Sequence, residues 1–206
     1  VRTRTGQPVH CLAFHVDYWD YLGWRDPFAD PRFSKRQRAY SAAFKQRSTY
    51  TPQMIVNGVT QFVGSRHHEA ESKIDAALKA KTTERIELRI ELHQQDELLQ
   101  VNFKLKQAKV GRVLHMALIE SSLKSRIRGG ENSGRTLIHA NVVRALHTID
   151  VSQQHEGFAR ISVPDNLSFS DSHFVGYVQD LATMQILGAA RCDLQSQPHP
   201  TGVDEP

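Results

Sequence analysis

Cysteine is almost absent from this sequence, and its scarcity excludes several classes of protein. The 206 residues contain two cysteines, Cys11 and Cys192, with no Cys-x-x-Cys motif and no zinc-ligand spacing. A disulfide framework, which needs several cysteines in a small chain, is excluded as well. Cys11 lies in an apolar run, where burial raises the pKa of a thiol, so we expect an inert core residue there.

Long hydrophobic runs are also missing. No apolar run approaches the ~20 residues that a membrane-spanning helix requires. Residues 1–8 are polar and lack the apolar core of a signal peptide, so targeting information is expected to be absent or removed. At 39% hydrophobic and 23% charged, the composition is that of an ordinary globular protein with enough apolar side chains for a core.

Positive and negative charges are nearly balanced in the sequence. Lys and Arg together number 26 and Asp and Glu 22, for a formal net charge of +4. This small basic excess permits anionic partners. The densest cluster, Lys35-Arg36-Gln37-Arg38, is expected on the solvated face of a helix, and no recognised nucleic-acid motif accompanies it. We therefore predict no nucleic-acid partner.

The first third of the chain has the pattern of alternating strands and helices. Val9 to Val16 is nearly continuous in apolar residues, which is typical of a strand covered on both faces of a parallel sheet. Asp30-Pro31 supplies an N-cap and a proline at the first helical position, so a helix is expected from Pro31 to about Gln46. Asn57-Gly58 between two apolar runs predicts a type I′ hairpin, and a second helix should follow, up to about Lys81.

From Thr83 the hydrophobic period changes to two, which is typical of strands with one buried face. The alternation predicts an antiparallel pair over 83–93 and 99–105, followed by strands at 113–119, 137–146, 158–163, 173–179 and 184–190. Strands at this short spacing without helical windows favour a β-sandwich over 82–191. We place the domain boundary near Lys81 and expect a disordered, polar, proline-rich tail over 192–206.

Aromatic residues make up only 8% of the chain, yet both tryptophans and two of the five tyrosines lie between His15 and Phe28. This concentration indicates that something is packed or bound there. His15, Asp17 and Asp20 are candidate metal ligands in the same segment, but nothing completes a ligand set, so we predict no metal site. The glycine-rich residues 129–134 lack the Gly-Lys-Thr ending of a phosphate loop, and no cofactor is expected.

Five segments of the chain are distinctive: His15-Val-Asp-Tyr-Trp-Asp-Tyr-Leu-Gly-Trp-Arg-Asp-Pro-Phe28, Gln37-Arg-Ala-Tyr40, Tyr50-Thr-Pro-Gln-Met54, Gly130-Glu-Asn-Ser-Gly134 and Asn141-Val-Val-Arg144. Together they resemble a family of secreted or periplasmic bacterial proteins known as domain of unknown function 1223. Members pair a thioredoxin-like domain with a β-rich C-terminal domain. The resemblance therefore implies an α/β, incomplete thioredoxin-like domain over 1–81, an all-β, antiparallel sandwich over 82–191, and a periplasmic or secreted location.

The same resemblance implies a binding site. In thioredoxin-like folds a proline, usually cis, faces the active-site dithiol, and Thr51-Pro52 matches that position. The backbone of Thr51 is then expected to pair with an extended peptide beside the aromatic segment. The implied peptide- or substrate-binding residues are Trp19, Asp20, Trp24, Tyr50, Thr51, Pro52 and Gln53.

The sequence departs from the family at its start. Members begin with a strand and a helix that carry Cys-x-x-Cys, and this sequence starts after them. The lost strand would lie between 9–16 and 54–56 and leave unpaired backbone groups. Either the two strands pair directly, or a partner supplies the strand, or the N-terminal half is a truncated fragment, which we favour.

Two functional hypotheses follow, and neither assigns a catalytic residue. The first is a relative of thiol-disulfide oxidoreductases, with a protein thiol or disulfide as partner, that is redox-silent in this chain because the dithiol is missing. The second is a non-catalytic peptide- or protein-binding module of the periplasm. The sequence does not indicate an oligomeric state.

Overall fold

The computed structural model describes residues 2–4, 6–80, 83–93, 98–129 and 133–194, and β-strands dominate it. Few helices occur and the sheets are antiparallel, as predicted for the residues after Thr83, whereas the parallel sheet expected in the first third is not observed among the described residues. The elements in chain order are β1 (Arg2–Arg4), β2 (Gln7–Val9), η1 (Asp20–Leu22), α1 (Pro31–Ala43), β3 (Gln53–Val56), β4 (Thr60–Val63), α2 (His67–Lys79), β5 (Ile86–His93), β6 (Leu98–Leu105), β7 (Arg112–Arg126), β8 (Thr136–Asp150), β9 (Glu156–Ser162), η3 (Phe169–Asp171), β10 (Ser172–Asp180) and β11 (Ile186–Asp193).

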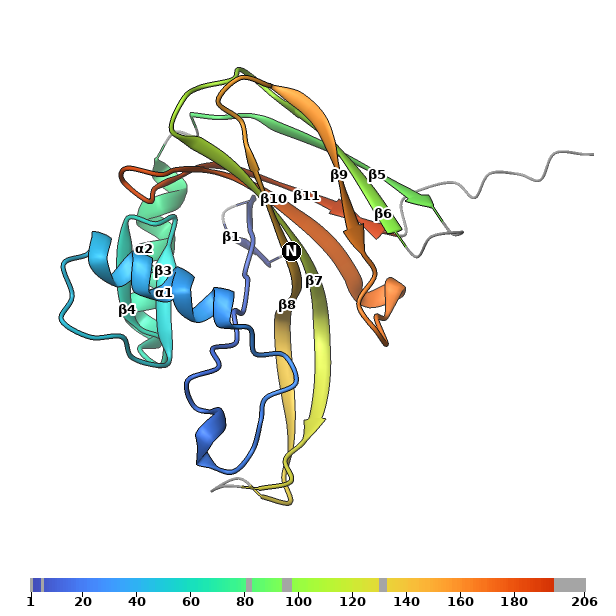
Figure 1. The fold of residues 1–206 in the computed structure, drawn as a ribbon. Coiled ribbons are helices and arrows are strands. Elements are labelled where there is room, and N and C mark those ends of the chain that lie inside the picture. The colour runs from blue at the N-terminus through green and yellow to red at the C-terminus, as the bar shows by residue number, and fades with distance from the viewer. Residues whose placement is uncertain (1, 5, 81–82, 94–97, 130–132, 195–206) are drawn as a thin grey trace, which may run out of the picture.

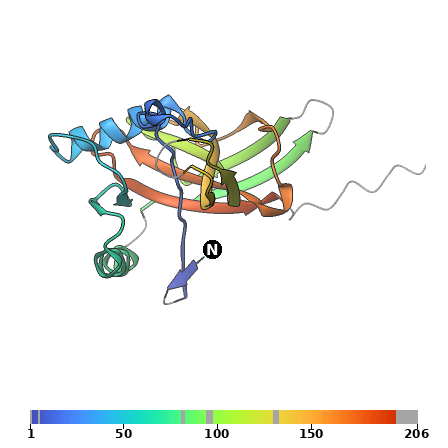
Figure 2. The ribbon, with the colours of Figure 1, turned by 90° about the horizontal axis from the view of Figure 1, so that it is seen from below.

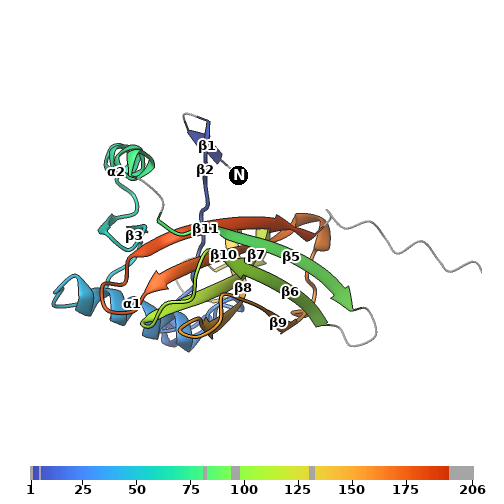
Figure 3. The same ribbon diagram turned by 90° about the horizontal axis from the view of Figure 1, so that it is seen from above.

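Two antiparallel sheets form the body of the molecule. The large sheet has the strand order β11-β10-β7-β8 and the small sheet β5-β6-β9, so all seven strands predicted after Lys81 are present (Figures 1 and 3). Their alternating apolar residues meet in one core, because Leu99 and Val101 of β6 pack with Leu114 and Met116 of β7. This burial of one face per strand is the physical origin of the two-residue period in the sequence.

Helix α1 covers the other face of the large sheet. Asp30 caps the helix by accepting a hydrogen bond from the backbone N–H of Arg32 at 2.7 Å, and Pro31 occupies the first turn, as predicted. Phe33 is only 3% exposed and packs against Val143 and Tyr177 of the sheet. The large sheet is therefore buried on both faces, by the small sheet on one side and by α1 on the other.

The prediction of a buried strand over Val9–Val16 is wrong. β2 ends at Val9 and pairs only with β1, in a hairpin that projects away from the sheets (Figure 2). Beyond it, Ala13 makes a single parallel bridge to Val142 of β8. Leu12 and Phe14 pack on the large sheet, whereas Cys11 beside them is exposed, so the expected inert core cysteine is a surface residue. Apart from this bridge at the edge of β8, the apolar run packs on the large sheet and forms no strand of its own.

The hairpin predicted around Asn57-Gly58 is confirmed. β3 and β4 pair in an antiparallel two-stranded sheet, and both turn residues have positive φ, 50° for Asn57 and 68° for Gly58, as a type I′ turn requires. The hairpin pairs with no strand from the Val9–Val16 segment, so direct pairing of the two, one of the alternatives considered, is not observed. Instead the Asn57 carbonyl accepts a hydrogen bond from the backbone N–H of Ile186 at 2.8 Å, which joins the hairpin to β11.

Gly58→Ala should therefore destabilise the fold by about 2–3 kcal/mol. A Cβ at this position would lie 2.0 Å from the carbonyl oxygen of Met184, in the β10–β11 turn. Gly111→Ala is the matched control, because Gly111 has a similar φ of 79° but a Cβ added there would meet no atom within 4 Å. Urea denaturation should show a clearly larger loss for Gly58→Ala. Equal losses would mean that contact with the β10–β11 turn does not constrain the hairpin.

The predicted domain boundary near Lys81 stays a prediction, although α1 and the residues before it pack closely on strands that follow the boundary. β11 extends to Asp193, two residues into the predicted tail. Leu194 packs against the core, and residues 195–206 of the predicted tail lie outside the described residues.

Candidate functional site

The structure brings the aromatic segment and the Thr51-Pro52 bond together. That peptide bond is cis, as expected. The indole N–H of Trp19 donates a hydrogen bond to Thr51 Oγ1 at 3.0 Å. The backbone N–H of Gly64 donates to the Pro52 carbonyl at 2.8 Å and ties the bond to the end of β4. Thr51 and Pro52 are both exposed.

Glutamine side chains brace the residues on either side of the proline. Gln37 of α1 donates from Nε2 to the Tyr50 carbonyl at 2.8 Å and to Gln53 Oε1 at 3.0 Å. It also accepts a hydrogen bond from the Tyr18 hydroxyl at 2.8 Å. The Tyr50 hydroxyl in turn donates to Gln61 of β4. The side chains of Tyr50 and Gln53 therefore hold the loop in position, and Thr51 and Pro52 form its open surface.

Large apolar side chains lie exposed next to this loop. Trp19 is 45% exposed, Tyr21 76% and Leu22 55%, and the rings of Trp19 and Tyr21 stack with centroids 6.5 Å apart. We call Trp19, Tyr21, Leu22, Thr51 and Pro52 the aromatic patch. Large exposed apolar side chains grouped in this way are typical of an interaction site.

Asp20 and Trp24, the other two expected site residues, lie on the loop that carries the patch. Asp20 Oδ1 accepts a hydrogen bond from the backbone N–H of Asp26 at 3.2 Å, which shapes the loop. Trp24 lies at the other end of η1, where the backbone of Gly23 and the Trp24 side chain pack against Gly129 in the β7–β8 connection. The structure thus groups Trp19 with the proline loop and places Trp24 beside the end of β7.

A second polar cluster was not predicted from the sequence. His15 Nδ1 lies 2.6 Å from Asp26 Oδ2, and the rings of His15 and His139 meet edge to face with centroids 5.1 Å apart. His139 Nε2 lies 2.7 Å from Ser125 Oγ, and the Phe28 ring packs against both histidines. We call these five residues the histidine cluster. It joins the 15–28 loop to β7 and β8.

Neighbouring groups shift the pKa values in the histidine cluster. Burial raises the pKa of Asp26, but the hydrogen bond from His15 and the hydrogen bond from the Phe28 backbone outweigh it, so the pKa lies below its ordinary value. The pKa of His139 is lowered by burial and by the nearby His15. Both shifts favour an ionised Asp26 beside a neutral His139.

The histidine cluster has part of the geometry of a nucleophilic site. Ser125 and His139 are within the hydrogen-bonding distance of a nucleophile and its general base. The carboxylate of Asp26, however, binds the other histidine, and Ser125 is only 7% exposed. The histidine cluster therefore holds the 15–28 loop against β7 and β8. Among the described residues, no group of three or more His, Cys, Asp or Glu side chains is placed to hold a metal ion.

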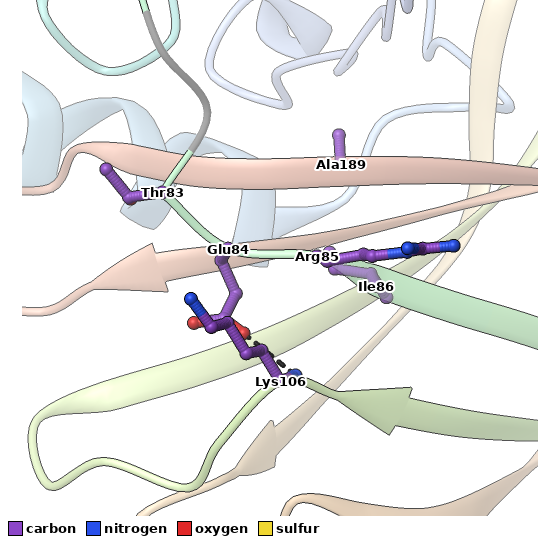
Figure 4. Close-up of a pocket in the computed structure, with 6 residues that line it drawn as sticks. All are labelled: Thr83, Glu84, Arg85, Ile86, Lys106 and Ala189. Atoms are coloured by element: carbon purple, nitrogen blue, oxygen red, sulfur yellow. Dashed lines mark hydrogen bonds between the residues drawn. The ribbon is translucent and has the colours of Figure 1, made fainter.

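Two pockets among the described residues lie away from the aromatic patch, and the second adjoins the histidine cluster at Phe28. The first, of about 490 Å³, is lined by Thr83, Glu84, Arg85, Ile86, Lys106 and Ala189, and in Figure 4 the Glu84 side chain turns toward the Lys106 backbone while Arg85 extends along β5. The second, of about 340 Å³, lies beside Phe28 and Arg144. Glu84 forms an ion pair with Arg112, and Glu120 forms one with Arg144. The buried carboxylates of Glu84 and Glu120 are therefore already neutralised by arginines.

One solved structure shares the fold of this chain. A crystal structure of a protein from Agrobacterium tumefaciens, determined by a structural genomics consortium, is 18% identical with a TM-score of 0.62, covering 93% of this chain and 83% of that chain. A domain of the outer membrane lipoprotein Omp28 from Porphyromonas gingivalis is 12% identical over 54% of this chain and 88% of that chain. Its TM-score of 0.28 is too low to support an argument.

Comparisons by sequence identify the family. No curated protein matches. Within the described residues no helix has the length and apolarity needed to cross a membrane. The model of the family described as "Protein of unknown function (DUF1223)" matches residues 2–179, which is most of the chain. This chain therefore belongs to the DUF1223 family, as its motifs predicted.

Proposed function

We propose that this chain is a non-catalytic protein- or peptide-binding module whose contact surface is the aromatic patch. The observation that carries the proposal is the exposure of Trp19, Tyr21 and Leu22 on a loop held in place by hydrogen bonds. Aromatic side chains that are exposed yet fixed lose little conformational entropy on binding, and they dominate the energetics of interfaces. Gln37 links the two parts of the patch, because it accepts a hydrogen bond from the Tyr18 hydroxyl and donates one to the Tyr50 carbonyl.

The shape of the patch favours an extended ligand. Thr51 and Pro52 are exposed beside the rings, at the start of β3. We propose that a partner segment pairs with the backbone of Thr51 while its apolar side chains cover Trp19 and Tyr21. This is the strand-addition mode of peptide recognition, in which backbone hydrogen bonds supply affinity and side-chain pockets supply specificity.

Trp19→Ala should weaken binding of such a partner by tenfold or more, because truncating a hot-spot residue typically costs at least about 2 kcal/mol. The partner would first be identified by crosslinking in envelope extracts and then titrated against the purified chain. Phe158→Ala is the control, since Phe158 of β9 is 55% exposed but lies outside the patch. Unchanged affinity for Trp19→Ala would exclude the aromatic patch as the contact surface.

A relation to thiol-disulfide exchange is the second proposal, and the exposure of Cys11 favours it. An exposed thiol can form a mixed disulfide with a partner, whereas cyclic exchange also needs a resolving thiol. A thioredoxin-like domain over 1–81 and a periplasmic or secreted location, where disulfides persist, belong to this proposal. We expect this chain by itself to be redox-silent. Reduction of a model disulfide at a rate that Cys11→Ser abolishes would contradict that expectation.

A further inference from the structure

β7 and β8 continue beyond the large sheet as a two-stranded ribbon. β10 pairs with β7 as far as Glu120, whereas the pairing of β7 with β8 continues to Arg126 and Thr136. We call residues 122–126 and 136–140, with the adjoining Arg128, the ribbon. In Figure 1 it extends away from the small sheet, at the end of the molecule where η1 lies.

The two faces of the ribbon differ in character. Alternation along the strands places Ser125 and His139 on the inner face, where they join the histidine cluster. The outer face is largely exposed, and Ile138, opposite Lys124, is 71% exposed. The residues of this outer face are Ser122, Lys124, Arg126, Arg128, Thr136, Ile138 and Ala140.

Three cations form a row on the outer face. Lys124 and Arg126 occupy alternate positions of β7, about 6.8 Å apart along the strand, and Arg128 follows two residues after the strand ends. No acidic residue is among the described residues of this face, and none of the three cations forms an ion pair with a described residue. Like charges in a row repel one another, and an anionic partner would relieve that repulsion.

The composition and shape of the face indicate the kind of partner. Three of its seven exposed residues are cations and only Ile138 is a large apolar side chain, whereas the buried centre of a protein interface is depleted in charged residues. Neither of the two pockets described above lies on the ribbon. A layer of lipid headgroups requires no shape complementarity, and it accommodates an aliphatic side chain between cations.

We propose that the outer face of the ribbon binds an anionic lipid surface. Lys124, Arg126 and Arg128 contact the headgroups, and Ile138 inserts between them. This site is independent of the aromatic patch, whose residues belong to the loop on the inner side of the ribbon and to the loop before β3. A membrane held by the ribbon would leave the patch free for the partner proposed above.

Cosedimentation of the full chain with vesicles tests this site. The chain should bind vesicles of phosphatidylcholine mixed with phosphatidylglycerol and not vesicles of phosphatidylcholine alone, and added salt should release it. The triple variant Lys124→Ser, Arg126→Ser, Arg128→Ser should lower the partition coefficient by about tenfold or more. The matched control removes the same charge from α1 and the segment after it, through Lys35→Ser, Arg38→Ser and Arg47→Ser, and should change partitioning less than about twofold.

Three results would overturn the proposal. Equal losses in the two triple variants would show that net charge alone drives binding. Equal binding to neutral vesicles would exclude the cations as the cause. Stronger binding of a double-stranded DNA fragment, lost in the ribbon variant, would identify nucleic acid as the partner instead. Trp19→Ala should still bind the anionic vesicles, so failure of the aromatic patch and failure of the ribbon are distinguishable.

Discussion

Replacing Arg112 by methionine should lower the free energy of unfolding by about 3–5 kcal/mol, because it leaves a buried carboxylate without a counter-charge. The Glu84 side chain is 1% exposed and that of Arg112 12% exposed, and Arg112 Nη1 donates to Glu84 Oε2 at 2.8 Å. The other oxygen of Glu84 accepts a hydrogen bond from the backbone N–H of Lys106 at 3.0 Å (Figure 4). Methionine keeps most of the apolar volume of arginine, so the loss measures charge and not a cavity.

The position of this ion pair explains why its loss should matter. The backbone N–H of Glu84 donates to the Leu187 carbonyl of β11 at 3.1 Å, and Glu84 packs against Gly188, so the residue lies where the start of β5 crosses the large sheet. A second variant with Glu84→Leu and Arg112→Met should recover most of the stability, because replacing a whole buried pair by apolar residues is often neutral. Urea denaturation measures both. An equal loss in the double variant would assign the effect to packing.

The strands and turns of this protein were predictable because their signals are local. A half-buried strand repeats its apolar residues every second position, which is visible within a window of eight residues in β5 and β6. Asp30-Pro31 starts a helix and Asn57-Gly58 forms a turn through local backbone geometry. Both the helix start and the turn are observed at the predicted positions.

The Val9–Val16 segment was mispredicted because its signal is ambiguous without tertiary context. A continuous apolar run is typical of a strand buried on both faces, but it also suits an irregular segment that packs on a sheet and bridges its edge strand at one residue. Leu12 and Phe14 pack on the cluster that contains Val143 and Tyr177, more than a hundred residues later in the chain. A short stretch of sequence cannot show that Leu12 and Phe14 pack on this sheet. It therefore cannot show that Cys11 beside them is exposed.

The candidate site also has a part that could be predicted and a part that could not. The proximity of Trp19 to Thr51 was anticipated from family resemblance, which carries tertiary information that periodicity lacks. The histidine cluster was missed because its members are separated by 11 residues between His15 and Asp26 and then meet His139 on β8. The sequence groups His15 with Asp17 and Asp20 only as candidate metal ligands, whereas in the structure Asp17 accepts a hydrogen bond from Ser34, Asp20 accepts one from the Asp26 backbone, and Asp26 is the partner of His15.

Acidification from pH 7 to pH 5 should lower the free energy of unfolding by about 4 kcal/mol through two buried histidines. Burial, with smaller contributions from Arg36 for His115 and Arg191 for His173, lowers the pKa of each histidine to about 4 from 6.5. His115 is 7% exposed and His173 3% exposed. The ionised form of each is therefore poorly accommodated in the folded chain.

The direction of the pH effect follows from which state binds the protons. Because the folded pKa lies below the unfolded one, only the unfolded chain binds protons between about pH 6.5 and pH 4, so stability is complete above that window and is lost as the pH falls through it. His115→Asn should lower stability at pH 7, since His115 bonds to Thr148 and Gln179, yet should weaken the pH dependence by about half. His147→Asn, at an exposed position of β8, should leave the dependence intact. Urea denaturation across this pH range measures the slopes, and an unchanged slope in His115→Asn would show that His115 is not one of the groups whose protonation unfolds the chain.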